Sequence, residues 1–231
     1  MDKEVAAMPR HVGFIMDGNG RWAQRRNRKR TFGHKKGAEV IEEVVNECFL
    51  EGVEVVSLFA FSTENMSRPQ EEKDRIFDLL GKFLKKYSKK LVEEKIRLIV
   101  SGDLSPLPQN LAGECSLQMA KTAGFSEKTL NIAINYGAKA EITAAVNSLI
   151  REGKTEVTEE DIEGRLYTGG LPPVDLVVRT SGEQRLSNFM LWQCAYAELY
   201  FTDVLWPDFH KEEVKNALVW YGTRKRRFGG V

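Results

Sequence analysis

Short runs rich in β-branched and aromatic residues alternate with amphipathic stretches along the chain, and this alternation constrains the fold more than any other feature. Strands that alternate with helices build a mostly parallel sheet. We therefore predict a single α/β domain over residues 11–231, with a mostly parallel six-stranded sheet covered by helices on both faces, and a frayed N-terminal arm over residues 1–10. The predicted strands are 11–16, 53–61, 96–100, 130–134, 174–178 and 198–201, and the predicted helices lie near 40–49, 76–91, 105–124, 138–151, 159–166 and beyond 210.

The composition argues against several classes of protein. The 231 residues carry a formal net charge of +1, which argues against a general nucleic-acid binder. Cys48, Cys115 and Cys194 lie far apart and form no C-x-x-C pair, so we expect neither disulfides nor structural zinc. Because the sequence shows no secretory signal and no apolar run of about 18 residues, we expect a cytoplasmic protein with at most peripheral membrane contact.

One hexapeptide after the first predicted strand combines an acid, two glycines and the start of a dense positive field. It reads Asp17-Gly18-Asn19-Gly20-Arg21-Trp22, and the next acid along the chain is Glu39. Glycines let backbone N–H groups approach a ligand closely, and such groups bind anions. The hexapeptide therefore predicts a phosphate or diphosphate site, with Asp17 as a metal ligand or an acid–base group. Ordinary turn chemistry followed by a solvated basic face also fits this stretch.

Polar residues follow several predicted strands at the point where each strand ends. Asp17 follows the first strand, Asn65 and Arg68 follow the second, and Arg179 follows the fifth. Because the carboxyl ends of parallel strands share one edge of a sheet, we expect these four side chains to converge. Arg185 and Ser187 come shortly afterwards and suit a second phosphate group. The arginines expected around Asp17 are Arg21, Arg30, Arg68, Arg179 and Arg185, enough for two anionic substrates or one large one.

Two other functions compete with a diphosphate site of this kind. Gly18-x-Gly20-x-x-Ala23 after a strand fits the fingerprint of a dinucleotide-dependent oxidoreductase. That fingerprint needs a helix that starts at once, where this chain has a run of Arg and Asn. It also needs an acid at the end of the second strand, where Phe61 and Ser62 stand. A non-catalytic partner subunit is the other alternative, although such a protein need not keep Asp17 and the arginines.

Three long motifs, in order, resemble the signatures of the cis-prenyltransferase family, and most closely its bacterial undecaprenyl diphosphate synthase type. They cover residues 11–22 with Arg30 and His34, residues 59–65, and residues 175–189 running on to 196–201. Two positions depart from the commonest pattern, because Met66 stands where Trp is frequent and Gln184 where His is frequent. The resemblance implies the family's α/β fold, with a hydrophobic tunnel walled by part of the apolar faces over 40–49 and 76–91.

The same resemblance implies an activity and a set of partners. The family is a group of magnesium-dependent transferases that condense isopentenyl diphosphate with an allylic diphosphate, usually farnesyl diphosphate. The implied product is a long cis-polyprenyl diphosphate, undecaprenyl diphosphate for the cell-wall lipid carrier. A homodimer is implied as well, in which Arg227-Phe228-Gly229 resembles a tail motif that reaches the active site of the other subunit.

The resemblance also implies roles for single residues. Asp17 and Glu198 match the magnesium ligands, and Asn65 matches the residue that the family treats as proton acceptor. Because a neutral carboxamide is a poor base, we expect Asn65 to orient the substrate while a substrate phosphate oxygen takes the proton. The matching substrate-binding positions are Gly18, Asn19, Gly20, Arg21, Arg30 and His34 for the allylic diphosphate, Arg179, Arg185 and Ser187 for isopentenyl diphosphate, and Trp22, Ser62, Thr63, Glu64, Met66, Arg68 and Leu186 as further contacts.

Overall fold

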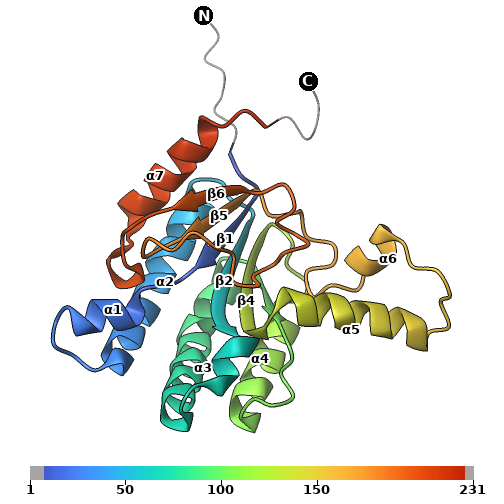
Figure 1. The fold of residues 1–231 in the computed structure, drawn as a ribbon, viewed down its shortest axis with the longest axis horizontal. Helices are drawn as coiled ribbons and strands as arrows, with labels where there is room; N and C mark the ends of the chain where they lie inside the picture. The colour runs from blue at the N-terminus through green and yellow to red at the C-terminus, as the bar shows by residue number, and fades with distance from the viewer. Residues whose placement is uncertain (1–7, 227–231) are drawn as a thin grey trace, which may run out of the picture.

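In the computed structural model, which describes residues 8–226, six strands form one parallel sheet (Figure 1). The strands are β1 (His11–Ile15), β2 (Val55–Ser62), β3 (Ile96–Ser101), β4 (Lys128–Tyr136), β5 (Leu176–Arg179) and β6 (Glu198–Phe201). Their spatial order is β3-β4-β2-β1-β5-β6, and every neighbouring pair is parallel. The prediction of a six-stranded α/β sheet is confirmed. Since β2 and β5 flank β1 on opposite sides, β1 stands where ligands bind in open α/β sheets.

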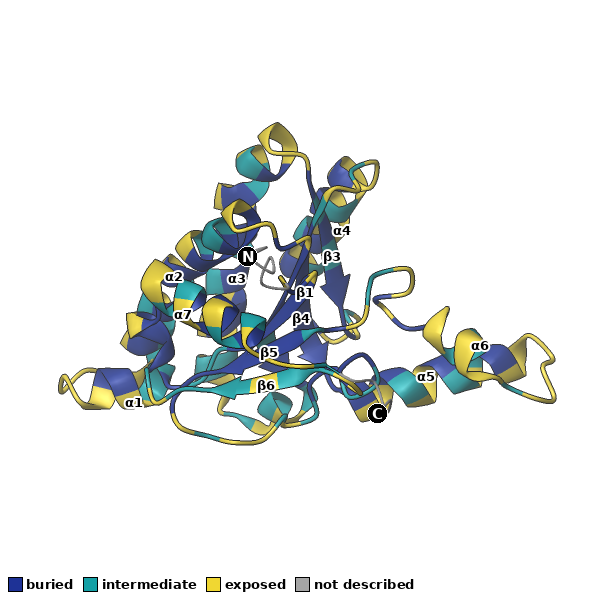
Figure 2. Ribbon diagram, turned by 90° about the horizontal axis from the view of Figure 1, so that it is seen from above, coloured by how far each residue is buried: buried dark blue, intermediate teal, exposed yellow. Residues whose placement is uncertain are grey.

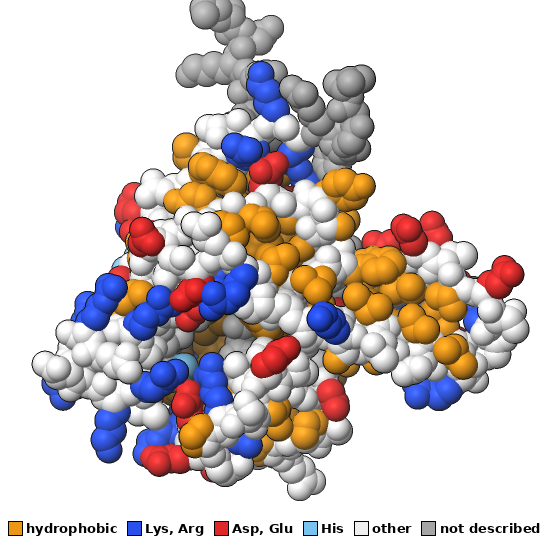
Figure 3. All heavy atoms as spheres, viewed as in Figure 1, with side chains coloured by type: hydrophobic (Ala, Val, Ile, Leu, Met, Phe, Trp, Pro, Cys, Tyr) orange, Lys and Arg blue, Asp and Glu red, His pale blue; other side chains and the backbone are white. Residues whose placement is uncertain are grey.

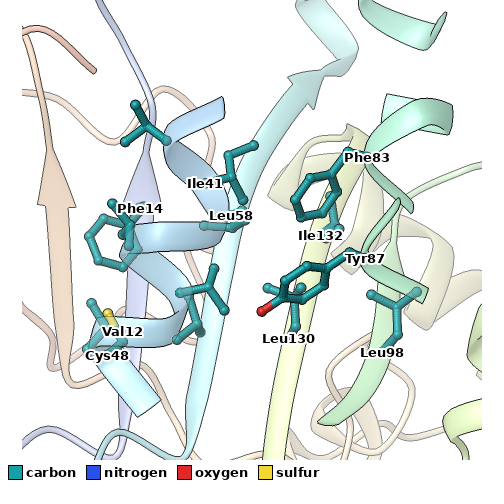
Figure 4. Close-up of a cluster of buried hydrophobic side chains, with 14 of the residues drawn as sticks. Val12, Phe14, Ile41, Cys48, Leu58, Phe83, Tyr87, Leu98, Leu130 and Ile132 are labelled. Carbon is teal, nitrogen blue, oxygen red and sulfur yellow. The ribbon is translucent and has the colours of Figure 1, made fainter. Parts of the chain in front are cut away.

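A layer of long helices covers one face of the sheet. These helices are α2 (Arg30–Leu50), α3 (Gln70–Glu93), α4 (Gln109–Thr122) and α7 (Lys211–Gly222). Side chains alternate along a strand, so every second residue of β1, such as Val12 and Phe14, points into this layer. There they meet the apolar faces of the helices, including Ile41 and Phe83, in one large core (Figure 4).

The second face of the sheet carries a smaller core. It is built around Ile15, Val177, Phe189 and Met190, and it lies under the segment 186–197 and the start of α5 (Ala138–Arg151). The rest of α5 and the short α6 (Glu159–Glu163) extend away from the sheet (Figure 2). The cover on this face is therefore mostly irregular chain, in contrast to the full helical layer opposite.

A short helix, α1 (Asn19–Gln24), begins directly after Gly18, whose φ of +105° suits glycine alone. The expectation that no helix starts there is wrong, and with it one of the two arguments against a dinucleotide site. α1 packs on α2, which begins at Arg30, well before the apolar pattern predicted. The two helices approach so closely that a Cβ at Gly33 would collide with the Asn19 backbone oxygen, and one at Gly37 with the Asn19 side chain.

The chain is tied to the sheet before β1 begins. Arg10, which the prediction placed in the frayed arm, donates its backbone N–H to Asp175 and pairs with Glu54 at 2.9 Å. The 3-10 helices η1 (Thr63–Ser67), after β2, and η2 (Trp206–Asp208), after β6, complete the described part of the fold. Within residues 8–226, none of the helices has the length and apolar character needed to cross a membrane.

Candidate active site

A cavity of about 360 Å³ opens at the carboxyl ends of β1, β2 and β5. Its volume falls within the range of small-molecule sites, roughly 300–1,000 Å³. The polar lining consists of Asp17, Asn19, His34, Ser62, Asn65, Arg68, Arg179, Arg185 and Ser187, and the apolar lining includes Ile41, Phe59, Ala60, Ile76, Leu79, Leu80 and Phe83. The structure thus brings together Asp17, Asn65, Arg68 and Arg179, as the strand-end argument predicted.

Asp17 is held firmly by the residues around the end of β5. Its backbone N–H donates to Thr180 Oγ1 at 3.0 Å, and the Thr180 hydroxyl donates to the Asp17 carbonyl oxygen at 2.6 Å. The carboxylate accepts hydrogen bonds from the Gly18 N–H at 2.6 Å and from Arg179 Nη2 at 3.1 Å. Arg21 Nη2 lies 3.6 Å from the same carboxylate. The Asp17 side chain therefore has a fixed direction at the polar end of the cavity.

Arg179 connects Asp17 to the loop that follows β5. It is the last residue of β5 and only 3% exposed. Its Nη1 donates to the Arg185 carbonyl oxygen and, at 2.7 Å, to Ser187 Oγ, while Nη2 donates to Asp17. Burial lowers the pKa of Arg179, and the hydrogen bond and charge of Asp17 oppose this shift. Since an arginine keeps its proton in proteins, the site contains a buried, permanently charged guanidinium.

Glu183 holds two further arginines beside the cavity. Arg185 Nη1 lies 2.5 Å from Glu183 Oε2, and Arg21 Nη2 lies 3.3 Å from Oε1. Arg21 also donates to the Ser181 carbonyl oxygen at 2.9 Å and to the Ser181 hydroxyl. Unlike Arg179, the Arg185 side chain is 60% exposed, so its guanidinium can turn toward a ligand.

Ser62 and Asn65 cap the short helix η1 at the cavity wall. The Ser62 N–H donates to Asn65 Oδ1 at 3.1 Å, and the Asn65 N–H donates to Ser62 Oγ at 3.3 Å. This reciprocal capping box fixes both side chains. Because the amide oxygen of Asn65 already accepts a hydrogen bond, the geometry favours an orienting role over proton transfer.

A second polar cluster joins the start of α2 to the start of α3. Glu72 Oε1 lies 3.1 Å from Arg68 Nη1, 3.6 Å from His34 Nε2 and 4.0 Å from Arg30 Nη2. Burial, followed by the charge of Arg68, lowers the pKa of His34, while Glu72 acts in the opposite direction. His34 is therefore mainly neutral at neutral pH. Lys and Arg side chains gather on the surface around α1 beside this cluster (Figure 3).

The sequence did not single out Glu72. Its spacing from Arg68 indicates only an ordinary i,i+4 helix pair. The contacts with Arg30 and His34 come from another helix, and no local pattern reveals them.

The apolar end of the cavity lies between α2 and α3. Phe83 lies at this end and stacks on Tyr87 with 5.2 Å between ring centroids (Figure 4). The Tyr87 hydroxyl donates to Asn46 Oδ1 at 3.0 Å, which ties α3 to α2 at this point. The lining includes Ile41 but not the later residues of the two apolar faces, which belong to the packed core.

Trp22, a predicted substrate contact, supports α1 in this structure. The side chain is 8% exposed, its Nε1 donates to Asp208 Oδ1 at 2.6 Å, and its ring stacks on Phe32. Met66 packs against the core, and Glu64 accepts a hydrogen bond from Asn188. The predicted contacts that lie outside the cavity lining are Gly18, Gly20, Arg21, Trp22, Arg30, Thr63, Glu64, Met66 and Leu186.

Glu198 lies at the amino end of β6, whereas Asp17 follows the carboxyl end of β1. It pairs with Leu176 at the start of β5, whereas Phe201 pairs with Arg179 at the cavity. At about 3.3 Å per residue, the two levels are separated by about 10 Å. Glu198 binds Arg224 at 3.1 Å instead. Within this chain the two carboxylates therefore lie at different levels of the sheet, because a parallel strand delivers its first residue to the far edge, and a magnesium ion held by both stays a prediction.

Asp17 is the carboxylate of this cavity that fits a magnesium ion. Among residues 8–226, no group of three or more His, Cys, Asp or Glu side chains could hold a metal. Magnesium needs no such group, because it usually takes one or two carboxylates and completes its shell with substrate phosphate oxygens and water. The residues present therefore fit a magnesium ion that arrives with a diphosphate.

Comparisons with known proteins agree on one family. The model of the family described as "Putative undecaprenyl diphosphate synthase" matches residues 15–229. An isoprenyl transferase of Fusobacterium nucleatum is 47% identical over 231 residues, which are 100% of this chain and 99% of that protein. One of Chromobacterium violaceum is 48% identical over 221 residues, which are 96% of this chain and 88% of that protein.

Solved structures give the same result for the fold. The lavandulyl diphosphate synthase of Lavandula x intermedia, solved in complex with dimethylallyl diphosphate, superposes with a TM-score of 0.90 at 31% identity and covers 96% of this chain and 98% of its own. "A probable undecaprenyl diphosphate synthase" of Campylobacter jejuni superposes with a TM-score of 0.81 at 36% identity and covers 96% of this chain and 99% of its own.

Proposed function

The chain belongs to the undecaprenyl diphosphate synthase family of cis-prenyltransferases, and from this membership we propose that it condenses isopentenyl diphosphate units with farnesyl diphosphate in a magnesium-dependent reaction. That the chain is a prenyl-elongating transferase follows from the family itself. The proposed product is a long cis-polyprenyl diphosphate, undecaprenyl diphosphate for the cell-wall lipid carrier.

The observation that carries this proposal is the division of one cavity into a cationic end and an apolar end. Arg68, Arg179 and Arg185 line the first, and Ile41, Leu80 and Phe83 line the second. An allylic diphosphate has the same two parts, a multiply charged head and a hydrocarbon tail. The related lavandulyl diphosphate synthase was solved with dimethylallyl diphosphate, a ligand of this kind.

The polar residues suit the charge changes of such a condensation. A carbon–oxygen bond of the allylic substrate breaks, a carbon–carbon bond to isopentenyl diphosphate forms, and a proton leaves the new chain. Asp17 would hold magnesium, which when bound neutralises the departing diphosphate. Arg179 fixes the direction of Asp17, and Arg185 with Ser187 would bind the diphosphate of isopentenyl diphosphate. Asn65, held by Ser62, would orient the substrate while a phosphate oxygen takes the proton.

Product analysis tests the proposal directly. The protein is incubated with farnesyl diphosphate, isopentenyl diphosphate and magnesium, and the products are identified by mass spectrometry. We expect polyprenyl diphosphates extended by isoprene units, and none when magnesium is chelated. Absence of extended products with both substrates and magnesium present would refute the proposal.

The same preparation separates the two alternatives. A saturable signal on titration with NADH would support the oxidoreductase, but we expect none, because β2 ends on Phe61 and Ser62 and offers no acid for a ribose. A partner subunit without activity of its own need not assemble Asp17 and Arg179 as this chain does.

A homodimer is the second part of the proposal. β6 is an edge strand; its Leu199 is 38% exposed, and Tyr196 just before it is 67% exposed. Hydrophobic side chains gather over this part of the surface and between α5 and α6 (Figure 3). An exposed edge with apolar neighbours is a typical protein interface. The tail motif Arg227-Phe228-Gly229, expected to reach the partner's site, lies outside the described residues.

Mixing two inactive variants tests the exchange of tails. One lacks residues 227–231 but keeps Arg226, which bonds to Asp175, and the other carries Asp17→Ala. In a mixed dimer, the site with an intact Asp17 can borrow the intact tail of the other chain, so activity should partly return. If subunits exchange and no activity returns, the tail does not act across the interface.

A further inference from the structure

Glu72 occupies an unusual position among the acids of α3. Its side chain is 17% exposed, and one oxygen faces Arg68, His34 and Arg30 at 3.1, 3.6 and 4.0 Å. The adjacent acid, Glu71, is 82% exposed and pairs with Arg75 on its own helix at 3.6 Å. Glu72 therefore turns toward the cavity side of the helix, while its neighbour makes an ordinary surface pair.

The cluster around Glu72 holds more cationic capacity than one carboxylate satisfies. Of the three contacts, only the one to Arg68 has hydrogen-bond length. The Nε2 atom of His34 is buried and has no hydrogen-bond partner. Two guanidinium groups and an imidazole thus surround a single negative charge, an arrangement that suits an anion with more oxygens and more charge than a carboxylate.

We propose that Glu72 is an internal counter-ion that occupies the place of a substrate phosphate in the free protein and returns to it when inorganic diphosphate is released. The inference rests on the proposed function, because that function supplies the diphosphate head of the allylic substrate as the incoming ligand. The Glu72 carboxylate and the diphosphate both need Arg30, His34 and Arg68, so they cannot occupy the cluster together. A diphosphate carries enough charge to displace one carboxylate when it enters, and Glu72 opposes its retention after the hydrocarbon tail has gone.

The size of the effect follows from competition. When only a fraction of molecules has the cluster open, the apparent affinity for a ligand falls by that fraction. An open fraction of about one tenth weakens the binding of diphosphate about tenfold. The cost is the same for substrate and for released diphosphate, but the substrate regains affinity through its apolar tail.

Glu72→Gln tests this directly, because it keeps the side-chain shape and removes the charge. Binding of inorganic diphosphate is measured by calorimetry with magnesium chelated, for the wild type, Glu72→Gln and the control Glu71→Gln. We expect Glu72→Gln to bind about tenfold more tightly than the wild type and Glu71→Gln to stay within about twofold. In turnover assays, inorganic diphosphate should inhibit Glu72→Gln at about tenfold lower concentration.

Equal or weaker binding by folded Glu72→Gln would overturn the proposal, as would undetectable binding by both it and the wild type. Should Glu72→Gln fail to fold, Glu72→Asp withdraws the carboxylate by one methylene and should shift the affinity in the same direction by less; an unchanged or weaker affinity would overturn the proposal. The calorimetric result needs no turnover. A failure of the proposed function would show instead as missing products in the wild-type assay.

Discussion

The two polar clusters at the cavity, a strand-end half around Asp17 and a helix half around Glu72, are built in different ways. In the strand-end half, Asp17, Arg179 and Ser187 lie at the ends of β1 and β5 or just beyond, and Arg179 is buried with its two terminal nitrogens bonded to protein. In the helix half, Arg30 and His34 project from α2, Glu72 projects from the first turn of α3, and Arg68 lies between η1 and α3. Their side chains meet around one carboxylate at mostly long distances.

This difference indicates a division of labour. Groups that stabilise charge as a bond breaks work best when they are fixed before the reaction, because no reorganisation is then needed. The strand-end half meets that condition. The helix half must exchange its own acid for a ligand, so it suits binding and release. Substitutions in the strand-end half should therefore change kcat, and those in the helix half should change affinity.

Asp17→Ala should give the largest effect. Removing one preorganised electrostatic contact often lowers kcat by about 10²–10³-fold, and loss of the magnesium anchor should cost at least that. Steady-state kinetics at saturating magnesium measure it, with circular dichroism to show that the fold is kept. A normal kcat with only a raised KM would contradict the assignment of the strand-end half to the chemical step.

Replacing Arg179 or Arg185 by lysine should give the next largest difference, which is a difference in kcat. Arg179→Lys keeps the charge but cannot reach Asp17, Ser187 and the Arg185 carbonyl together, so kcat should fall by about 100-fold, equivalent to two charge-assisted hydrogen bonds. Arg185→Lys is the matched comparison, because Arg185 is exposed and pairs with Glu183 rather than with Asp17. Its kcat should stay within about threefold, and its loss should fall on the KM for isopentenyl diphosphate. Similar losses in both would show that burial of Arg179 does not matter.

A pH titration of ligand binding should give the smallest effect and should involve only the helix half. The pKa of His34 lies below its ordinary value in the free protein, through burial and then Arg68. A diphosphate beside His34 favours the imidazolium form, so its pKa rises in the complex, binding takes up a proton, and affinity grows as the pH falls. Between about pH 7.5 and 6, the wild type should gain about threefold more affinity for inorganic diphosphate than His34→Gln does.

That comparison of wild type and variant removes two other sources of pH dependence. The ligand titrates equally in both proteins, and Arg30 and Arg68, which face His34, remain charged throughout. Glu72 is the remaining titratable group beside His34 and is common to both. If the affinity for inorganic diphosphate depended on pH in the same way in the wild type and in His34→Gln, His34 would not take up the proton on binding.

The convergence of the strand ends could be predicted from the sequence, because it depends only on the alternation of strands and helices. Asp17 and Arg179 are far apart in the chain, yet a parallel sheet must bring the ends of β1 and β5 to one edge. The helix over 138–151 was likewise predicted with the bounds that α5 has, since Gly137 precedes a clear apolar pattern.

Contacts between helices could not be predicted in this way. Trp22 in a polar turn suggests a ligand contact, but its partner Asp208 lies 186 residues further along the chain. Glu198 was assigned to the metal from a resemblance of motifs, which gives the identity of a residue but not the edge of the sheet that it faces. Only the register of β5 with β6 supplies that information.

Gly33 and Gly37 lie where the contact between α1 and α2 leaves no space for a larger residue. Either position, once it gains a side chain, pushes against Asn19, and Asn19 follows Asp17 by only two residues. A side chain at either position of α2 would therefore displace Asn19, and with it the short segment that carries Asp17. On the α3 side of the cavity the lining includes the side chains of Leu79, Leu80 and Phe83, and the last two also belong to the large core. A change of side-chain volume on α3 would therefore alter the room for a hydrocarbon tail, whereas any side chain at Gly33 or Gly37 would disturb the hexapeptide.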